Sequence, residues 1–369
     1  MDANNIQPSP SPEMYCGVAV KPDKEEKRNI RRQYLKAGGV IYLNIILFNI
    51  VLILAVHLIG GIYGGDMSSL KAMEKGLNQL ISDYPWADTV ISCSVPIISE
   101  ITAILVGAKL LKVNLRGLFT RNGFDGKELM MSGSICLGMQ TLSAIIIVIG
   151  DMILGNFGLE SKTAEIVANS SFGASVYLYF YACLLGPLLE ELLYRGVLLQ
   201  GLRKYNERFA LIISAVIFGL MHQNYQQFVL GFLVGLVLGA ITLRSGSIVP
   251  AVIFHIILNT TASLSSLAMQ AADYEAFVAS ASGNITIETI TSANPAFIII
   301  MLLNAVFRYG FLFAMIPLLV ISIVKKRGVR TPTPAGKTRG WPILAQSWIW
   351  YLVLVSYIIL NFRNIVYTG

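Results

Sequence analysis

Charged residues are scarce in this chain. Only 13% of its 369 residues are Asp, Glu, Lys or Arg, and 55% are apolar. A soluble domain carries about 25% charged residues. Several apolar runs reach the roughly 20 residues that a helix needs to cross the hydrocarbon core of a bilayer. This pattern excludes an ordinary soluble protein and predicts an all-α, polytopic transmembrane bundle.

Cysteine and histidine are also rare, with four and three copies. The cysteines have neither CxxC nor metal-type spacing, and three of them fall in apolar runs, so we expect thiols that fill the core. The first 37 residues are polar and basic, without the short apolar stretch that precedes a signal-peptide cleavage site. We expect no cleaved signal peptide.

Hydropathy predicts eight to nine membrane spans. The candidate ranges are 38–60, 88–110, 130–154, 172–193, 209–221, 228–243, 248–269, 296–324 and 342–360. The fifth and sixth are shorter than about 17 residues, the lower limit for a simple span. We expect the fifth helix to begin before its apolar run, within the polar residues 203–208.

Basic and non-basic loops alternate along the chain. The basic segments are the N-terminal segment, 109–127, 195–208, Arg244 and 325–339, whereas 61–87, 155–171 and 270–295 are acidic or near neutral. The positive-inside rule therefore predicts a cytoplasmic N-terminus and a C-terminus on the far side. The net charge of +7 is interpreted as membrane topology, not as nucleic-acid binding. Short loops favour a bacterial cell membrane.

Three regions are predicted. Residues 1–37 form a cytoplasmic tail, whose first 21 residues are too polar to order themselves and whose basic segment 22–36 attracts anionic lipid. Residues 38–324 form the transmembrane core, and residues 325–369 add a basic loop and a last transmembrane helix. No internal repeat is found, which weakens the alternative of a transporter built from duplicated halves.

A glutamate doublet ends the fourth span. Glu191 and Arg195 are four residues apart in the favourable order for an ion pair on one helical face, and Glu190 points about 100° away from that face. Pro187 is expected to bend the helix beside the carboxylates. Ionisable groups inside spans usually mark function. Unless both glutamates only fix helix packing, the unpaired Glu190 is predicted to act as a general base toward water.

Two of the three histidines follow the doublet. His222 comes directly after the fifth span, and His255 and Asn259 share one face of the seventh because they are four residues apart. Such a pair can donate two hydrogen bonds to an oxygen that becomes negative during acyl transfer. His222 is predicted to help Glu190 hold and deprotonate water. Each histidine alone is better explained by interhelical hydrogen bonding, but the three polar elements together favour a site.

The three patterns Glu190-Glu191-x-x-x-Arg195, Phe218-x-x-x-His222 and His255-x-x-x-Asn259 resemble the signatures of the CAAX protease and bacteriocin-processing family, the intramembrane glutamic proteases. The resemblance covers residues 172–267. It implies an eight-helix core, water activation by Glu190 with His222, and oxyanion stabilisation by His255 and Asn259. It also implies support from Glu191, Arg195 and Phe218. The implied partners are the lipid bilayer and a membrane-associated protein or peptide substrate.

Other readings stay open. Serine and aspartyl mechanisms are disfavoured because the chain has no GxSG loop and no YD and GxGD pair, and HExxH is also absent. No cofactor is expected, although Glu190, His222 and His255 match the ligand number of a catalytic zinc site. The runner-up function is a non-proteolytic bacteriocin-immunity or scaffold protein of the same fold. A transporter is the third reading, because intramembrane charges also occur along substrate paths.

Three further polar or small-residue features are assigned to architecture. Glu100 and Arg308 both fall near mid-span, and we expect them to pair. His57, with Asn44 and Asn49, is expected to make interhelical hydrogen bonds. Three glycines spaced by four residues along the sixth span predict close helix packing: Gly231, Gly235 and Gly239.

Overall fold

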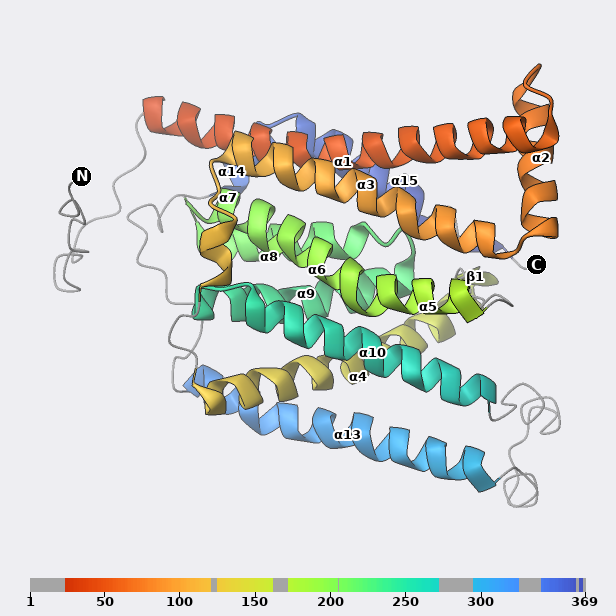
Figure 1. Ribbon diagram of the computed structural model, residues 1–369. Coiled ribbons are helices and arrows are strands. Elements are labelled where there is room, and N and C mark those ends of the chain that lie inside the picture. Colours follow the sequence, from red (N-terminus) through yellow and green to blue (C-terminus); the bar gives the residue numbers. More distant parts are fainter. Residues whose placement is uncertain are drawn as a thin grey trace, which may run out of the picture.

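The computed structural model is a bundle of long helices that run roughly along one direction (Figure 1). It describes residues 24–120, 125–161, 172–204, 206–271, 295–324, 340–362 and 365–367. The first half of the chain forms α1 (Lys24–Gly64), α2 (Leu70–Asp83), α3 (Trp86–Leu111), the 3₁₀ turn η2 (Arg116–Phe119), α4 (Gly126–Asn156) and β1 (Leu159–Ser161). A set of short consecutive segments follows: α5 (Phe172–Phe180), η3 (Tyr181–Leu185), α6 (Gly186–Glu191), η4 (Leu192–Leu198) and α7 (Leu199–Arg203). The remaining elements are α8 (Glu207–Leu220), α9 (Tyr225–Ser245), α10 (Val249–Ala271), α13 (Pro295–Val324), α14 (Gly340–Ala345), α15 (Ile349–Phe362) and β2 (Ile365–Tyr367).

The helices make this an integral, multi-pass membrane protein. Six are long and apolar enough to cross a bilayer, and two shorter apolar helices accompany them within the described residues. Each predicted span falls largely on helical residues, although the fourth is a run of short consecutive segments and the last is divided between two helices. The fifth, α8, begins at Glu207, as expected, because Asn206 accepts a hydrogen bond from the Phe209 amide and caps its N-terminus.

Three features of the bundle were not predicted from the sequence. The predicted last span is divided into α14 and α15 by a break at residues 346–348. The predicted loop 61–87 contains the amphipathic helix α2, which was not expected there and which packs along α1. A three-residue antiparallel pair joins β1 to β2. The predicted tail 1–21 and the basic loop 325–339 lie outside the described residues, whereas α1 continues from Lys24 through the predicted juxtamembrane segment.

Basic residues gather at one end of the bundle. Lys204 follows α7 there, and its Nζ donates a hydrogen bond to the Leu111 carbonyl at the end of α3, at 2.7 Å. Arg244 near the end of α9 pairs with Glu128 at the start of α4, at 3.3 Å. The strand pair lies at the opposite end (Figure 1). Among the described residues, Lys204 and Arg244 of the predicted basic segments therefore lie at one end of the bundle, and residues 159–161 of a predicted non-basic segment lie at the other.

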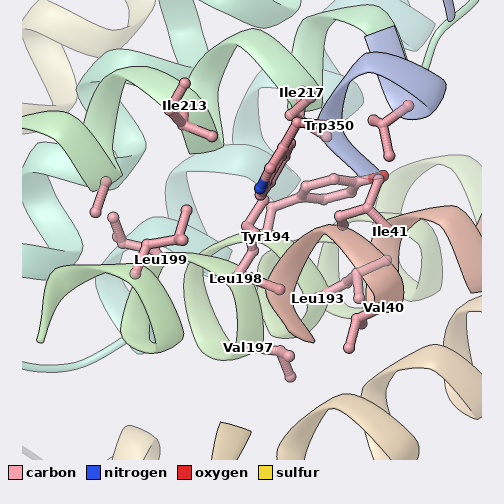
Figure 2. Packing of buried hydrophobic residues seen from close by; sticks show 14 of the residues in the cluster. Val40, Ile41, Leu193, Tyr194, Val197, Leu198, Leu199, Ile213, Ile217 and Trp350 are labelled. Carbon is pink, nitrogen blue, oxygen red and sulfur yellow. The ribbon is translucent and has the colours of Figure 1, made fainter. Parts of the chain in front are cut away.

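The largest buried apolar cluster surrounds η4. Figure 2 shows Leu193, Tyr194, Val197, Leu198 and Leu199 packed between α1, α8 and α15. The contacting side chains include Val40 and Ile41 from α1, Ile213 and Ile217 from α8, and Trp350 from α15. Since η4 directly follows the glutamate doublet, this core fixes the position of the doublet in the bundle.

Two expectations about isolated polar residues are wrong. Glu100 and Arg308 form no ion pair, because α3 and α13 lie on opposite sides of the bundle (Figure 1). The His57 ring and the Asn49 amide contact carbonyls of their own helix, at Ile53 and Ile45, and not a neighbouring helix. A helical carbonyl four residues back is the closest acceptor for such a side chain, so it satisfies the polar group locally.

Candidate active site

The helix that carries the glutamate doublet is irregular on both sides of it. The π-helical segments η3 and η4 flank α6. At the first, the Gly186 amide bonds to the Tyr181 carbonyl, five residues back, just before Pro187, which has no amide proton to donate. Such π-bulges occur frequently at functional sites. The predicted distortion near Pro187 is present, as a change of helical pitch.

Glu191 and Arg195 form a fully buried ion pair. Arg195 Nη1 lies 2.8 Å from Glu191 Oε1, and both side chains are 0% exposed. The same carboxylate oxygen lies 3.0 Å from His255 Nδ1 on α10. One carboxylate thus joins the fourth predicted span to the seventh, and the predicted pairing of Glu191 with Arg195 is present.

Phe218 and α9 complete the surroundings of Arg195. The guanidinium carbon lies 4.0 Å from the centroid of the Phe218 ring, a cation–π arrangement. Arg195 Nη2 donates to the Gly235 carbonyl at 3.4 Å. A Cβ at Gly235 would lie 3.3 Å from that same nitrogen, so the absence of a side chain on α9 lets the guanidinium approach. The glycine spacing predicted to permit close packing does so here.

Glu190 faces away from the Arg195 pair, as the helical spacing predicts. Its Oε2 lies 3.5 Å from His255 Nε2, and it has no hydrogen-bond partner in the described part of the chain. The two nitrogens of one imidazole therefore face two different carboxylates. The sequence did not predict this bridging position of His255, because the spacing of residues along α6 and α10 does not show how the two helices cross.

His222 is held by the turn between α8 and α9. Its Nδ1 lies 2.9 Å from the Phe218 carbonyl, which can only accept a hydrogen bond, so Nδ1 carries the proton and Nε2 is the remaining nitrogen. Asn224 donates to the His222 carbonyl at 3.1 Å and also caps α9. The capping role of Asn224 was not predicted, although an asparagine before an apolar run is a recognised helix-start signal.

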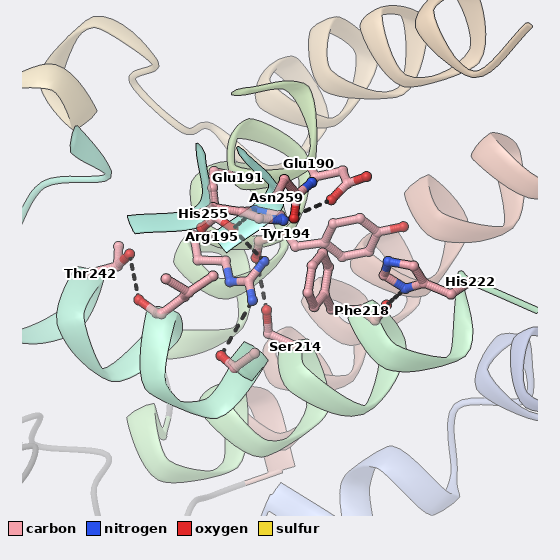
Figure 3. A network of polar contacts seen from close by, with 12 residues as sticks. Glu190, Glu191, Tyr194, Arg195, Ser214, Phe218, His222, Thr242, His255 and Asn259 are labelled. Carbon is pink, nitrogen blue, oxygen red and sulfur yellow. Dashed lines mark hydrogen bonds and ion pairs between the residues drawn. The ribbon is translucent and has the colours of Figure 1, made fainter. Parts of the chain in front are cut away.

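Asn259 is fixed by the first π-helical segment. Its Nδ2 donates to the Ala182 carbonyl at 2.8 Å. A carboxamide nitrogen carries two protons, so a second donor remains on the same atom. Figure 3 shows His255 and Asn259 close to the glutamate doublet, and the Phe218 ring between Arg195 and His222.

All four predicted catalytic residues line one cavity. Glu190, His222, His255 and Asn259 border a space of about 370 Å³, together with Phe218 and Tyr181. Glu191 and Arg195, the predicted supporting residues, do not line this cavity and are fully buried. Glu190 and Asn259, the first and the last of these residues, are 69 positions apart in the chain, and the fold brings their side chains to one volume.

A metal site is not evident in this geometry. Among the described residues, no group of three His, Cys, Asp or Glu side chains is placed to hold a metal ion. Glu190, His222 and His255 share the cavity without forming such a group, which gives the zinc alternative no geometric support.

Comparisons with known proteins match the part of the chain that carries these residues. Residues 172–261 match the family described as Rce1-like, type II CAAX prenyl endopeptidases. Over 104 residues the chain is 28% identical to the Bacillus subtilis protein YdiL, whose name describes it as a putative membrane peptidase. That match covers 28% of this chain and 42% of the relative, so it spans less than half of either protein. No solved structure matches the chain.

Proposed function

We propose that the protein is an intramembrane endopeptidase of the CAAX protease and bacteriocin-processing family, a proposal supported by the match of residues 172–261 to the Rce1-like family. It hydrolyses a peptide bond of a membrane-associated protein or peptide, with water as the nucleophile and without a covalent enzyme intermediate. The observation that carries the proposal is the convergence of Glu190, His222, His255 and Asn259 on one cavity within the bundle.

Glu190 is the proposed general base. Its Oε2 lacks a hydrogen-bond partner among the described residues, so a water molecule in the cavity can donate a proton to it. His222 presents Nε2 as an acceptor, because Nδ1 is committed to the Phe218 carbonyl. The two acceptors together hold both hydrogens of a water and leave its lone pairs for attack on the substrate carbonyl.

His255 and Asn259 are the proposed oxyanion donors. The His255 ring stands between the two carboxylates, with Nδ1 3.0 Å from Glu191 Oε1 and Nε2 3.5 Å from Glu190 Oε2. As Glu190 takes the proton of water, negative charge moves to the substrate oxygen, and His255 Nε2–H remains beside both positions. The second amide proton of Asn259 supplies another donor.

The cleavage test compares wild-type protein with Glu190→Gln on a membrane-anchored peptide library in detergent. Loss of a general base or oxyanion donor typically costs about 10²- to 10⁴-fold in rate, and we expect a loss in this range. Ser263→Ala is the matched control, since Ser263 lines the same cavity but has no proposed role. Activity equal in wild type and Glu190→Gln would contradict the proposal.

The same assay with a chelator tests the metal alternative. Chelator-resistant cleavage supports a water activated by Glu190, whereas chelator-sensitive cleavage that zinc restores would replace it with a zinc mechanism. We further propose that the basic end of the bundle faces the cytoplasm of a bacterial cell, with the N-terminus on that side. Accessibility labelling of single cysteines at the two ends of the bundle measures this orientation.

A further inference from the structure

A second cavity lies next to the proposed active site, and about half of its lining is polar. It has a volume of about 90 Å³. We name it the Glu100 chamber, and its polar wall includes Asn44, Ser99, Glu100, Tyr194 and Gln223. Tyr181 lines both this chamber and the 370 Å³ cavity that holds Glu190. The two spaces therefore adjoin at one side chain.

The chamber holds hydrogen-bond acceptors that lack donors. Glu100 is 4% exposed and Asn44 is 8% exposed. In the described part of the chain, Glu100 Oε2 and Asn44 Oδ1 have no hydrogen-bond partner. None of the lining residues is Lys, Arg or His. The Tyr194 hydroxyl, which can donate or accept, also lacks a partner among the described residues. Buried polar groups without partners are costly in a bilayer, so the complementary ligand is a small molecule that both donates and accepts hydrogen bonds.

Water fits this space in size and chemistry. At about 30 Å³ per water in the liquid, the chamber accommodates roughly three molecules. A buried water needs two to four polar partners, and the chamber supplies them from α1, α3 and the turn after α8.

We propose that the Glu100 chamber binds a small cluster of water molecules, anchored by Glu100 and Asn44, which replenishes the nucleophile in the neighbouring cavity. The replenishing role rests on the proposed hydrolytic function, whereas the binding of water does not. Each hydrolysis consumes one water: its oxygen bonds to the carbonyl carbon as the C–N bond breaks. One of its protons goes to the new amine, and the other is released when the new carboxylic acid ionises.

Radiolytic footprinting of the full-length protein in ¹⁸O-labelled water tests the binding of water. Hydroxyl radicals form from water in place and oxidise adjacent side chains. Tyr194 and Tyr357 line the chamber although they are 0% and 3% exposed. Tyr34, equally buried at 0%, does not line it and serves as the internal control. We expect Tyr194 and Tyr357 to be labelled several-fold faster than Tyr34.

Variants then test the anchors. Glu100→Leu and, independently, Asn44→Leu should reduce labelling of Tyr194 and Tyr357 toward that of Tyr34, whereas Glu100→Gln should retain most of it. Thr102→Val is the matched control on α3, because its hydroxyl bonds to the Ile98 carbonyl of the same helix. Equal labelling of all three tyrosines in wild type would overturn the proposal, as would unchanged labelling in both leucine variants. Loss of labelling on adding sodium ions would also overturn it, by showing that a cation fills the chamber.

The kinetics of peptide cleavage test the replenishing role. Glu100→Leu should lower kcat several-fold with KM unchanged, and Thr102→Val should change neither. Unchanged kcat despite lost labelling would overturn the replenishing role alone. If wild-type protein cleaves no peptide, the proposed protease function fails, while the footprint still decides whether the chamber binds water.

Discussion

His255 Nδ1 lies 3.0 Å from Glu191 Oε1, and its Nε2 lies 3.5 Å from Glu190 Oε2. This histidine therefore links the supporting carboxylate, which Arg195 neutralises, to the carboxylate that faces the cavity.

Breaking the buried ion pair should lower stability far more than breaking a surface pair. Breaking a buried pair by removing one partner typically costs about 3–5 kcal/mol, because the other charge is left in a low-dielectric site. We expect Arg195→Met to lower the free energy of unfolding by about this amount, measured by denaturant titration in detergent. Arg203→Met is the control, since the Arg203 side chain is 32% exposed in its pair with Glu207.

A double-mutant cycle on the same pair separates charge from packing. Glu191→Gln and Arg195→Met should be markedly non-additive, because the second substitution removes a charge that the first has already left without its partner. Strict additivity of the two unfolding free energies would show that Glu191 and Arg195 do not interact as the 2.8 Å contact indicates.

Phe218→Leu should weaken the support of Arg195. The guanidinium lies 4.0 Å from the ring centroid, and such a contact is worth about 0.5–2 kcal/mol. Because the ring also packs edge-on against His222 and His255, we expect lower kcat together with this loss of stability. Phe232→Leu is the control, as that ring stacks on Phe228 instead. Equal effects of the two substitutions would contradict a specific role of Phe218.

At Gly219 the backbone of α8 lies in close contact with the backbone of α9 near the site. A Cβ there would lie 2.8 Å from the Phe228 carbonyl oxygen and 2.9 Å from the Phe232 amide nitrogen, so the backbone of α9 must move. We expect Gly219→Ala to cost about 1–3 kcal/mol, typical of overpacking, and to lower cleavage by displacing His222. At Gly239 the added methyl would meet the end of the Leu211 side chain, which can rotate away. Gly239→Ala should therefore be milder in thermal unfolding and cleavage assays.

Trp350 tests whether the last helix is integral to the bundle. Its Nε1 donates to the Tyr34 carbonyl at 3.0 Å and joins α15 to α1. Trp350→Phe should destabilise the protein by about 1 kcal/mol, the net value of a typical hydrogen bond, plus the lost packing. Trp348→Phe should have little effect, because Trp348 is 59% exposed. Comparable melting temperatures for Trp350→Phe and wild type would indicate that α15 contributes little.

Much of the candidate site could be predicted from local spacing. A helix repeats every 3.6 residues, so Glu191 and Arg195 had to share a face, and Glu190 had to point elsewhere. The same rule placed His255 and Asn259 together on α10. Apolar run lengths located the membrane helices, because the thickness of a bilayer sets the length that a span must have.

The crossing of distant helices could not be read in this way. Glu100 and Arg308 lie in two well-predicted spans, yet α3 and α13 occupy opposite sides of the bundle, and Glu100 instead faces a chamber beside the site. Nor did any spacing place His255 between both carboxylates. Periodicity records which residues share a face of one helix, whereas the partner of that face depends on side-chain shape and close contacts between helices, such as Gly219 against α9.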